Sequence, residues 1–185
     1  YTLSLHDALP ISFHAKTKIR DLALMTLLLG TGIRVSECVG LNINDVDFNT
    51  GGIRIHRKGG KEVIVYFGAE VEDALADYMA ERKHITPEPG HEDALFLSLQ
   101  KKRLNVRSVE NLVKKYAKIV TPLKKITPHK LRSTYGTNLY RETGDIYLVA
   151  DVLGHEDVNT TKKHYAALED ERRRSARNKV QLRDK

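Results

Sequence analysis

The sequence has few of the residues on which several large classes of protein depend. Its 185 residues include one cysteine and no tryptophan. The single Cys38 excludes a framework of intrachain disulfides and fits the reducing cytoplasm. Long hydrophobic runs are also missing, since the longest, LALMTLLLG at residues 22–30, is far shorter than the roughly 20 residues that cross a bilayer. We therefore expect a cytoplasmic protein without a membrane partner, in which residues 22–30 belong to a core helix.

Negative charge is scarce relative to positive charge. The chain has 31 Lys and Arg against 24 Asp and Glu, which gives a formal net charge of +7. Such an excess favours a polyanionic partner, nucleic acid above all. Between Lys101 and Lys125 there are nine basic residues, and Glu110 is the one acid. This segment is either a solvated helix face or a helix that lies along DNA phosphates and releases their counterions.

The first residues differ in character from the rest. YTLSLHDALPI corresponds to a translation of a common sequencing-library adapter, so we expect residues 1–12 to be a non-native segment fused to a shortened coding sequence. Residues 13–168 would then form one folded domain. Residues 169–185 are mostly charged and would form a C-terminal tail, helical if a partner surface supports it.

The hydrophobic pattern predicts a mainly α fold with one small antiparallel β-sheet (α+β). The strands come from GIRIHRKGGKEVIVYFG, residues 52–68, where alternating apolar residues flank a Lys-Gly-Gly turn. ALFLS, residues 94–98, predicts a short extended piece. Dense or periodic apolar residues predict helices at residues 19–30, 34–41, 69–85, 106–116, from 128, 145–154 and 160–168. Thr127 is the expected N-cap of the helix from 128, with Pro128 at its first position, and Asp145 is the expected N-cap of the helix that ends at 154.

Three stretches place basic side chains where they could act together. GTGIRVSE exposes Arg34 directly after a Gly-Thr-Gly break, and TPHKLRSTYGT sets His129 and Arg132 on one face of a first helical turn. The hairpin turn RKGGK offers Lys58 and Lys61. Each signal is weak alone, because an isolated Arg is usually a surface charge and a lone His is usually structural.

The stretch LGHEDVNTTKKHYA adds His155 and Tyr165. Guanidinium groups suit the oxygens of a phosphate and the charge of its transition state. A tyrosine hydroxyl, with an ordinary pKa of about 10, needs a base before it attacks near neutral pH. A histidine can accept that proton, and a lysine can donate one to a departing sugar oxygen. The set predicts metal-free phosphoryl transfer through a phosphotyrosine.

Four blocks in this order, GTGIRVSECVGL, HRKGGKE, TPHKLRSTYGTNL and LGHEDVNTTKKHY, resemble the tyrosine recombinase (phage integrase) family, especially Xer-like and mobile-element integrases. The resemblance covers roughly residues 19–170. It implies the catalytic-domain fold of that family and a site-specific recombinase that cleaves and rejoins DNA. It implies no metal or nucleotide cofactor.

The resemblance also implies a role for each candidate residue. Arg34 and Arg132 would clamp the scissile phosphate, and His155 would donate a hydrogen bond to it. Glu37 matches the acidic residue that the family places after the first arginine to orient its neighbours. The proton-transfer and nucleophile roles would fall to Lys58 as acid toward the leaving 5′ oxygen, His129 as acid or base, and Tyr165 as the nucleophile that forms a 3′-phosphotyrosyl link.

The partners implied are double-stranded DNA and, for the full-length protein, a homo-tetramer on that DNA. An N-terminal core-binding domain is expected to be absent from the chain, and residues 170–182 would pack onto a neighbouring protomer. The residues that we expect to contact DNA outside the catalytic set are Lys61, Lys101, Lys102, Arg103, Arg107, Lys114 and Lys115.

Some details depart from the family pattern. Arg57 replaces the first glycine of the Gly-Lys-Gly-x-Lys turn, and ten positions separate His155 from Tyr165 where many members have nine. The polar run between these two residues resembles a hinge. His164 should point away from Tyr165, as sequence neighbours on a helix do. Two rival tyrosines, Tyr140 and Tyr147, sit among apolar residues and are interpreted as core.

Three alternatives stay open. The chain could be a non-catalytic DNA-binding relative, although every catalytic position is filled. It could be a type IB topoisomerase or telomere resolvase with the same chemistry, although the LGH block favours an integrase. A metal-dependent nuclease would have to use Asp45 and Asp47, which NINDVDF makes more typical of turn residues.

Overall fold

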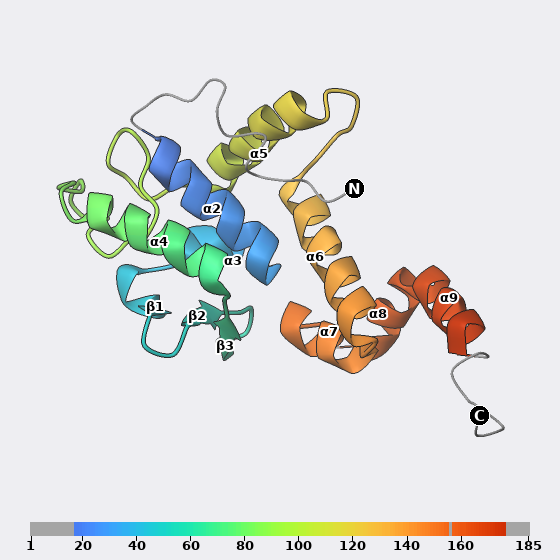
Figure 1. Cartoon of the computed structure of the whole chain (residues 1–185). Coiled ribbons are helices and arrows are strands. Elements are labelled where there is room, and N and C mark those ends of the chain that lie inside the picture. Colours follow the sequence, from blue (N-terminus) through green and yellow to red (C-terminus); the bar gives the residue numbers. More distant parts are fainter. Residues whose placement is uncertain (1–16, 156, 177–185) are drawn as a thin grey trace. The chain divides into compact units, whose positions relative to one another are not determined.

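The computed structural model describes residues 17–155 and 157–176 (Figure 1). The expected non-native segment 1–12 and the end of the charged tail lie outside the described residues. The chain divides into two compact units, residues 1–133 and 134–185. Each unit is described by itself.

The first unit is built on two helices that pack side by side. α2 (Lys18–Thr31) contacts α4 (Ala69–Arg82) along its length (Figure 1). The leucine-rich run makes α2 a core helix, as predicted, because Leu24, Leu27 and Leu28 are almost completely buried. Among the described residues of this unit, the other complete helices are α3 (Val35–Gly40), the 3-10 helix η1 (Ile43–Asp45) and α5 (Val106–Val120).

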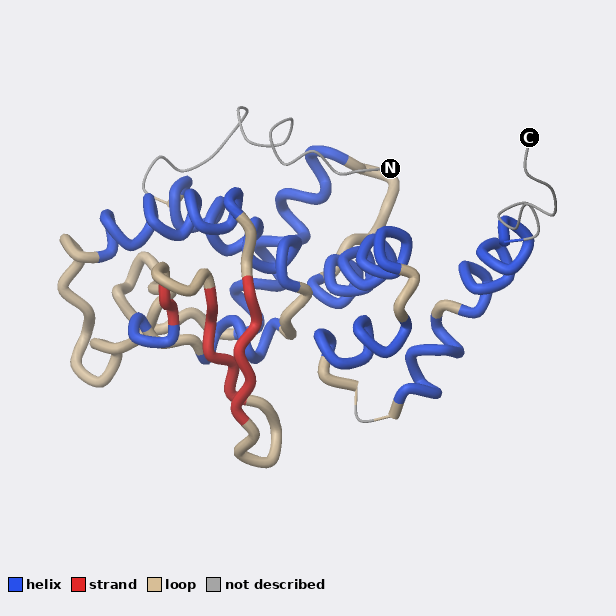
Figure 2. The backbone as a smooth tube through the Cα atoms, turned by 60° about the horizontal axis from the view of Figure 1, so that its bottom comes forward, coloured by secondary structure: helices blue, strands red, loops and turns tan. Residues whose placement is uncertain are grey.

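A three-stranded antiparallel sheet, in the order β1-β2-β3, lies beside these helices. The predicted hairpin is confirmed as β2 (Gly52–His56) and β3 (Glu62–Tyr66). Gly59 and Gly60, with φ of 82° and 75°, form the turn, which extends beyond the strands in Figure 2. β1 (Val46–Asp47) was not predicted, because its two residues lie in a segment rich in turn formers.

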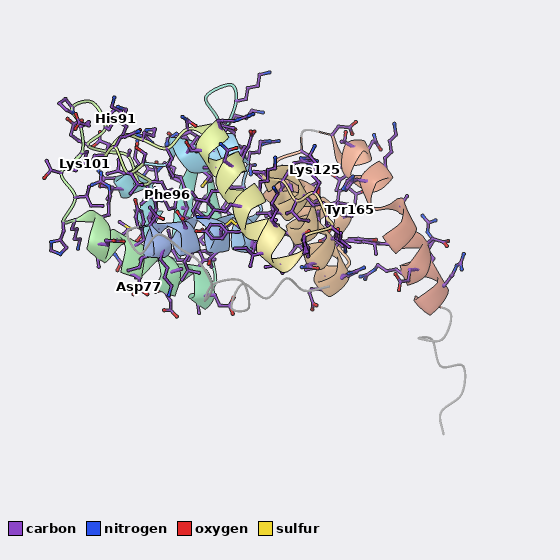
Figure 3. The ribbon with its side chains drawn as sticks, turned by 90° about the horizontal axis from the view of Figure 1, so that it is seen from above. Asp77, His91, Phe96, Lys101, Lys125 and Tyr165 are labelled. Atoms are coloured by element: carbon purple, nitrogen blue, oxygen red, sulfur yellow. The ribbon has the colours of Figure 1, made fainter. Side chains whose placement is uncertain are left out.

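The predicted extended piece at residues 94–98 is not a strand. It makes two isolated bridges, Asn42 with Ala94 and Leu97 with Arg103. The segment is held in place by its buried side chains. Phe96 (Figure 3) is 2% exposed and stacks on Tyr78, with ring centroids 5.2 Å apart. The segment therefore contributes core side chains rather than a further strand of the sheet.

A buried polar cluster joins α5 to α2. The Tyr116 hydroxyl donates to Asp21 Oδ2 at 2.6 Å, and Arg20 donates to Asp21 Oδ1 through Nε at 2.8 Å. Burial and the Asp21 carboxylate raise the pKa of the Tyr116 hydroxyl, so it stays a donor. Because Val109 and Val113 are buried on the same side, the opposite, basic face of α5 is exposed.

The second unit consists of short helices. α6 (Pro128–Thr143) begins in the first unit and is followed by α7 (Ile146–Leu153), α8 (Val158–His164) and α9 (Ala166–Ala176). Both predicted N-terminal caps are confirmed. Thr127 Oγ1 accepts from Lys130 N at 3.2 Å, and Asp145 Oδ1 accepts from Tyr147 N at 2.9 Å.

The architecture agrees with the predicted fold class, which is mainly α with a small antiparallel sheet. The predicted C-terminal helix at residues 160–168 is instead two helices, α8 and α9, because the chain breaks at Tyr165 with φ −108° and ψ 15°. Within the described part of the chain, no helix is long and apolar enough to cross a bilayer.

Candidate active site and nucleic-acid interface

Two of the predicted phosphate ligands meet at the turn between α2 and α3. α2 ends at Gly32 in the left-handed conformation, with φ of 64°, and Arg34 is the N-cap of α3. Arg132 reaches this turn from the first part of α6, and its Nη1 donates to the Gly32 carbonyl at 2.6 Å. The Arg132 side chain is buried, with 7% of the residue exposed. The fold thus brings together two arginines that are almost 100 positions apart.

Glu37 organises the same turn. Its buried carboxylate accepts from Arg34 N at 2.8 Å and from Arg34 Nη1 at 2.9 Å. Arg57 Nε lies 3.6 Å from the same carboxylate. Glu37 therefore orients Arg34 and connects it to the start of the β2–β3 turn, while the Arg34 side chain keeps 42% of its surface exposed.

The proton-transfer candidates of the first unit are exposed. Lys58 and Lys61 lie at the hairpin turn, which Arg57 N closes by donating to Lys61 O at 2.7 Å. His129 is exposed on the first turn of α6. Side chains with this exposure can meet a substrate that arrives from solvent.

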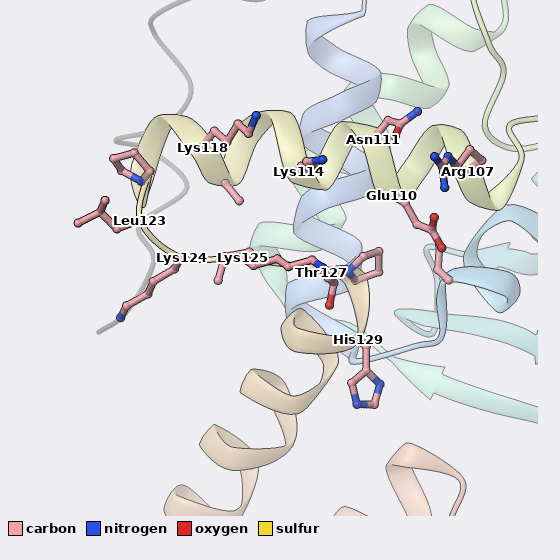
Figure 4. A pocket seen from close by; sticks show the side chains of 15 residues that line it. Arg107, Glu110, Asn111, Lys114, Lys118, Leu123, Lys124, Lys125, Thr127 and His129 are labelled. Atoms are coloured by element: carbon pink, nitrogen blue, oxygen red, sulfur yellow. The ribbon is translucent and has the colours of Figure 1, made fainter.

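A basic pocket of about 690 Å³ lies between α5, the loop that follows it and the first turn of α6. Figure 4 shows Arg107, Lys114 and Lys118 along α5, and Lys124 and Lys125 on the loop that follows it. His129 and the side chain of Val35, the neighbour of Arg34, also line it. Glu110 is the only acidic residue in this lining. The pocket joins the basic face of α5 to the predicted active-site residues of this unit.

One predicted DNA contact has a structural role instead. Arg103 Nη1 donates to the carbonyls of Val39 at 3.0 Å and Leu41 at 2.8 Å, and its Nη2 donates to Asn42 Oδ1. Because this half-buried guanidinium ties residues 39–42 together, we remove Arg103 from the expected DNA contacts. Sequence reasoning missed this role because a run of three basic residues does not reveal which one turns inward.

The other predicted DNA contacts that lie outside the basic pocket and the hairpin turn differ in their surroundings. Lys101 and Lys102 are exposed in a tight turn, where Lys101 has a φ of 62°. Lys115 is exposed on α5, and its Nζ lies 5.7 Å from the centre of the Tyr116 ring. It does not line the basic pocket.

The predicted nucleophile, Tyr165 (Figure 3), is buried in the core of the second unit. It is 3% exposed, and its ring lies 6.0 Å from that of Tyr140. Its hydroxyl lies against Gly136, where an added Cβ would overlap with it, and the Leu153 side chain closes the same space. Tyr165 must leave this cluster before it can attack any substrate.

Three predictions around Tyr165 need correction or confirmation. Tyr140 is buried as predicted, but Tyr147 is 63% exposed, because the buried stripe of α7 begins one residue earlier at Ile146. His164 does not point away: its ring meets Tyr165 edge to face, with centroids 4.9 Å apart. The prediction failed because α8 ends at Tyr165, so the two residues do not share regular helical geometry.

Most of the polar run before Tyr165, which was predicted to be a hinge, is the helix α8, Val158–His164; Glu156 lies outside the described residues. Asp157 caps α8 by accepting from Asn159 N at 2.8 Å. Thr161 is fully buried, and His155 Nδ1 and Thr161 Oγ1 share a hydrogen bond of 2.5 Å. The polar sequence gave no sign that Thr161 would be buried, because a pattern of polar residues does not show which of them turns inward.

Metal chemistry gains no support from the acidic residues. Asp45 accepts from Asn42 N at 2.8 Å, and Asp47 accepts from Thr50 and Asn49, whose hydrogen bonds lower the pKa of the Asp47 carboxyl. Both acids therefore bind neighbouring residues, although they are not turn residues as predicted: Asp45 ends a short 3-10 helix, Ile43–Asp45, and Asp47 lies in β1. The described residues contain no cluster of three or more His, Cys, Asp or Glu with metal-binding geometry.

Comparison with known proteins identifies the family. The profile of the phage integrase family matches residues 4–172, so the chain belongs to this family. The match begins inside the segment that we expected to be non-native. Similar proteins include the tyrosine recombinase XerC of Thermodesulfovibrio yellowstonii, 38% identical over 146 residues that cover 77% of this chain and 48% of that protein. XerS of Streptococcus agalactiae serotype III is 37% identical over 166 residues, which cover 88% of this chain and 46% of XerS.

Solved structures agree. The crystal structure of XerA recombinase matches with a TM-score of 0.76 and 31% identity, over 87% of this chain and 58% of XerA. XerH recombinase bound to its difH substrate before cleavage matches with a TM-score of 0.76 and 26% identity, over 85% of this chain and 46% of XerH. The predicted recombinase fold is thereby confirmed. The chain spans about half the length of the curated relatives that it matches.

The packing at Gly136 predicts how Tyr165 can be released. Gly136→Ala should displace the Tyr165 ring, because the new methyl group would overlap with the hydroxyl, and such overpacking costs about 1–3 kcal/mol of stability. We expect tetranitromethane to nitrate Tyr165 faster in this variant, as measured by peptide mass spectrometry. Exposed Tyr147 should be nitrated equally in both proteins.

A double-mutant cycle provides the matched control. In a Tyr165→Phe background the clashing hydroxyl is gone, so Gly136→Ala should lower the melting temperature less than in the wild type. Unchanged nitration of Tyr165, together with equal losses of stability in the two backgrounds, would contradict the packing described here.

Proposed function

We propose that this chain is the catalytic part of a site-specific DNA recombinase that cleaves and rejoins double-stranded DNA through a 3′-phosphotyrosyl intermediate, without metal. The observation that carries the proposal is the turn at which buried Arg132 is held on the Gly32 carbonyl, two residues before Arg34. Membership of the phage integrase family supports it. So do relatives named tyrosine recombinases and the XerH structure with its DNA substrate.

The two arginines would act on the scissile phosphate. A guanidinium has several N–H donors in a fixed plane, so Arg132 can bond to Gly32 and still present other N–H groups. Arg34 is steadied by Glu37 on one side and exposed on the other. Donors fixed in advance stabilise the extra charge of a pentacoordinate transition state without reorganising during the reaction.

The remaining residues would move the atoms and protons. Tyr165 Oη forms a bond to phosphorus as the bond from phosphorus to the 5′ oxygen breaks. His129 accepts the tyrosine proton, Lys58 donates a proton to the 5′ oxygen, and His155 donates a hydrogen bond to the phosphate. Rejoining is the reverse reaction with a new 5′ hydroxyl, so the energy of the broken bond is kept in the phosphotyrosyl ester.

Burial of Tyr165 would keep the free protein inactive. The ring contributes to the hydrophobic core of the second unit, so its departure exposes apolar surface and has to be offset by binding to DNA or to another protomer. In the full-length protein we expect four protomers on the DNA, and the charged tail would pack between them. Release of Tyr165 would then be coupled to assembly.

The basic pocket would position the DNA backbone. Five lysines and arginines line it, and each neutralised phosphate releases counterions. Contacts of this kind supply affinity and register rather than base recognition. The DNA contacts that we retain are Lys61, Lys101, Lys102, Arg107, Lys114 and Lys115, to which the pocket adds Lys118, Lys124 and Lys125.

Covalent trapping of DNA tests the function. The whole chain is incubated in EDTA with nicked duplexes whose binding arms are randomised, because cleavage near a nick releases a short fragment and leaves the protein attached. We expect an adduct that survives SDS and carries DNA on Tyr165, identified by mass spectrometry. Tyr165→Phe should abolish it. An adduct that persists in Tyr165→Phe, or that forms only with Mg²⁺, would overturn the assignment.

Salt dependence tests the basic pocket. The affinity for a fluorescent duplex of random sequence should fall with KCl concentration, and the double variant Lys114→Ala/Lys118→Ala should lower the slope of log K against log salt by about 2, since each lost phosphate contact removes about 0.9. The control is Lys18→Ala/Lys83→Ala, which removes two exposed lysines that do not line the pocket. Equal slopes for the two double variants would mean that the pocket does not bind the DNA backbone.

A further inference from the structure

Thr161 contacts both predicted catalytic residues of the second unit. Its hydroxyl and His155 Nδ1 share a 2.5 Å hydrogen bond, and its carbonyl accepts from Tyr165 N at 3.1 Å. The residue is completely buried. Thr160, its neighbour in sequence, is exposed, so the two threonines of the polar run differ entirely in their surroundings.

The backbone of His155 is fixed independently of this contact. α7 ends at Gly154 with φ of 65°, and His155 N donates to Ala150 O at 2.9 Å. With the main chain held, the remaining freedom of His155 is the rotation of its side chain and the position of its proton. The hydrogen bond from the Thr161 hydroxyl affects both the rotation of the His155 ring and the position of its proton.

The direction of the hydrogen bond between Thr161 and Nδ1 determines what Nε2 can do. In a neutral imidazole one nitrogen carries hydrogen and the other accepts, and the partner of one nitrogen selects the state of the other. When Thr161 donates to Nδ1, the ring proton is on Nε2. When the ring is protonated, Nδ1–H donates to the Thr161 oxygen and Nε2 still carries hydrogen. In both of these states Nε2 is a donor, which is what a phosphate oxygen requires. A neutral ring whose Nδ1–H donates to the Thr161 oxygen would leave Nε2 an acceptor, so the inference requires Thr161 to be the donor to the neutral ring.

We propose that Thr161 is a positioning residue that fixes the His155 ring with Nε2–H as the donor and links that ring to the helix end that holds Tyr165. This inference rests on the proposed function, because it assigns the reason for which His155 must be a donor. A buried valine would fill the same space but would leave Nδ1 without the hydroxyl, and the tautomer would no longer be selected.

Nitrogen NMR tests the hydrogen bond without any DNA. The whole chain is labelled with ¹⁵N-histidine, and the His155 signals are assigned by their loss in a His155→Gln variant. In the wild type, Thr161→Ser and the control Thr160→Val, the shifts should report hydrogen on Nε2 in the neutral ring. In Thr161→Val they should move toward a mixture of tautomers. Wild-type shifts in Thr161→Val would overturn the inference.

Single-turnover adduct formation tests the catalytic consequence. Thr161→Val should react about 10- to 100-fold more slowly, as when a hydrogen bond that orients a histidine is removed elsewhere, with unchanged affinity for DNA. Thr161→Ser and Thr160→Val should react at close to the wild-type rate, and melting curves should show all three variants folded. Thr161→Ser keeps the hydroxyl and loses the methyl group, so a normal rate in this variant would show that the hydroxyl, and not the packing of the side chain, is required.

The possible failures are distinguishable. If Thr161→Val changes the tautomer but cleaves normally, Thr161 is a structural residue and the positioning role is wrong. If the wild-type chain forms no adduct at all, the proposed function fails and the catalytic part of the inference fails with it. The NMR result still decides whether Thr161 selects the tautomer of His155.

Discussion

The hydrogen bond from Arg132 to the Gly32 carbonyl is the interaction on which the rest of the site depends. A guanidinium on a buried residue such as Arg132, which is 7% exposed, is costly unless its donors are paired. The carbonyl is available because α2 ends at Gly32 in the left-handed conformation, which directs this peptide group away from the helix. One bond thus connects the start of α6 to the turn that carries Arg34, and both arginines gain fixed positions before any DNA arrives.

A single buried carboxylate balances the positive charge around that turn. Glu37 binds Arg34 through both the backbone and the side chain of that residue, and it lies within ion-pair distance of Arg57 at the start of the hairpin turn. Arg57 stands where the family pattern has glycine, and its φ is not positive, so the backbone there accepts an arginine without strain. The second unit has a different means of control, because Tyr165 is kept in an apolar cluster and its hydroxyl lies against Gly136. In the proposed mechanism, the first unit holds the two phosphate-binding arginines in place, and the second unit keeps the tyrosine buried.

The sequence predicted local structure well where a periodic signal was strong. The leucine run of α2, the glycine turn of the hairpin and the caps at Thr127 and Asp145 all depend on neighbours within a few positions. The short strand β1 was missed because two residues carry no period, and its pairing is decided by β2. The motif blocks named the candidate residues, but no local pattern could show that Arg103 turns inward.

The burial and contacts of the candidate residues could not be predicted either, because they too depend on residues that are distant in sequence. Burial of Tyr165 and the contact between Thr161 and His155 arise from packing between helices, which a polar sequence does not announce. The end of α8 at Tyr165 likewise brings the His164 ring against the predicted nucleophile.

The proposed mechanism depends above all on Arg132, which would act on the phosphate while it is bound to the Gly32 carbonyl. The most direct measurement is the rate of adduct formation by Arg132→Lys, in which the lysine keeps the charge and can still donate to Gly32 but lacks the planar fork. We predict a loss of about 100-fold or more with unchanged DNA affinity and melting temperature. Cleavage at the wild-type rate would contradict the account.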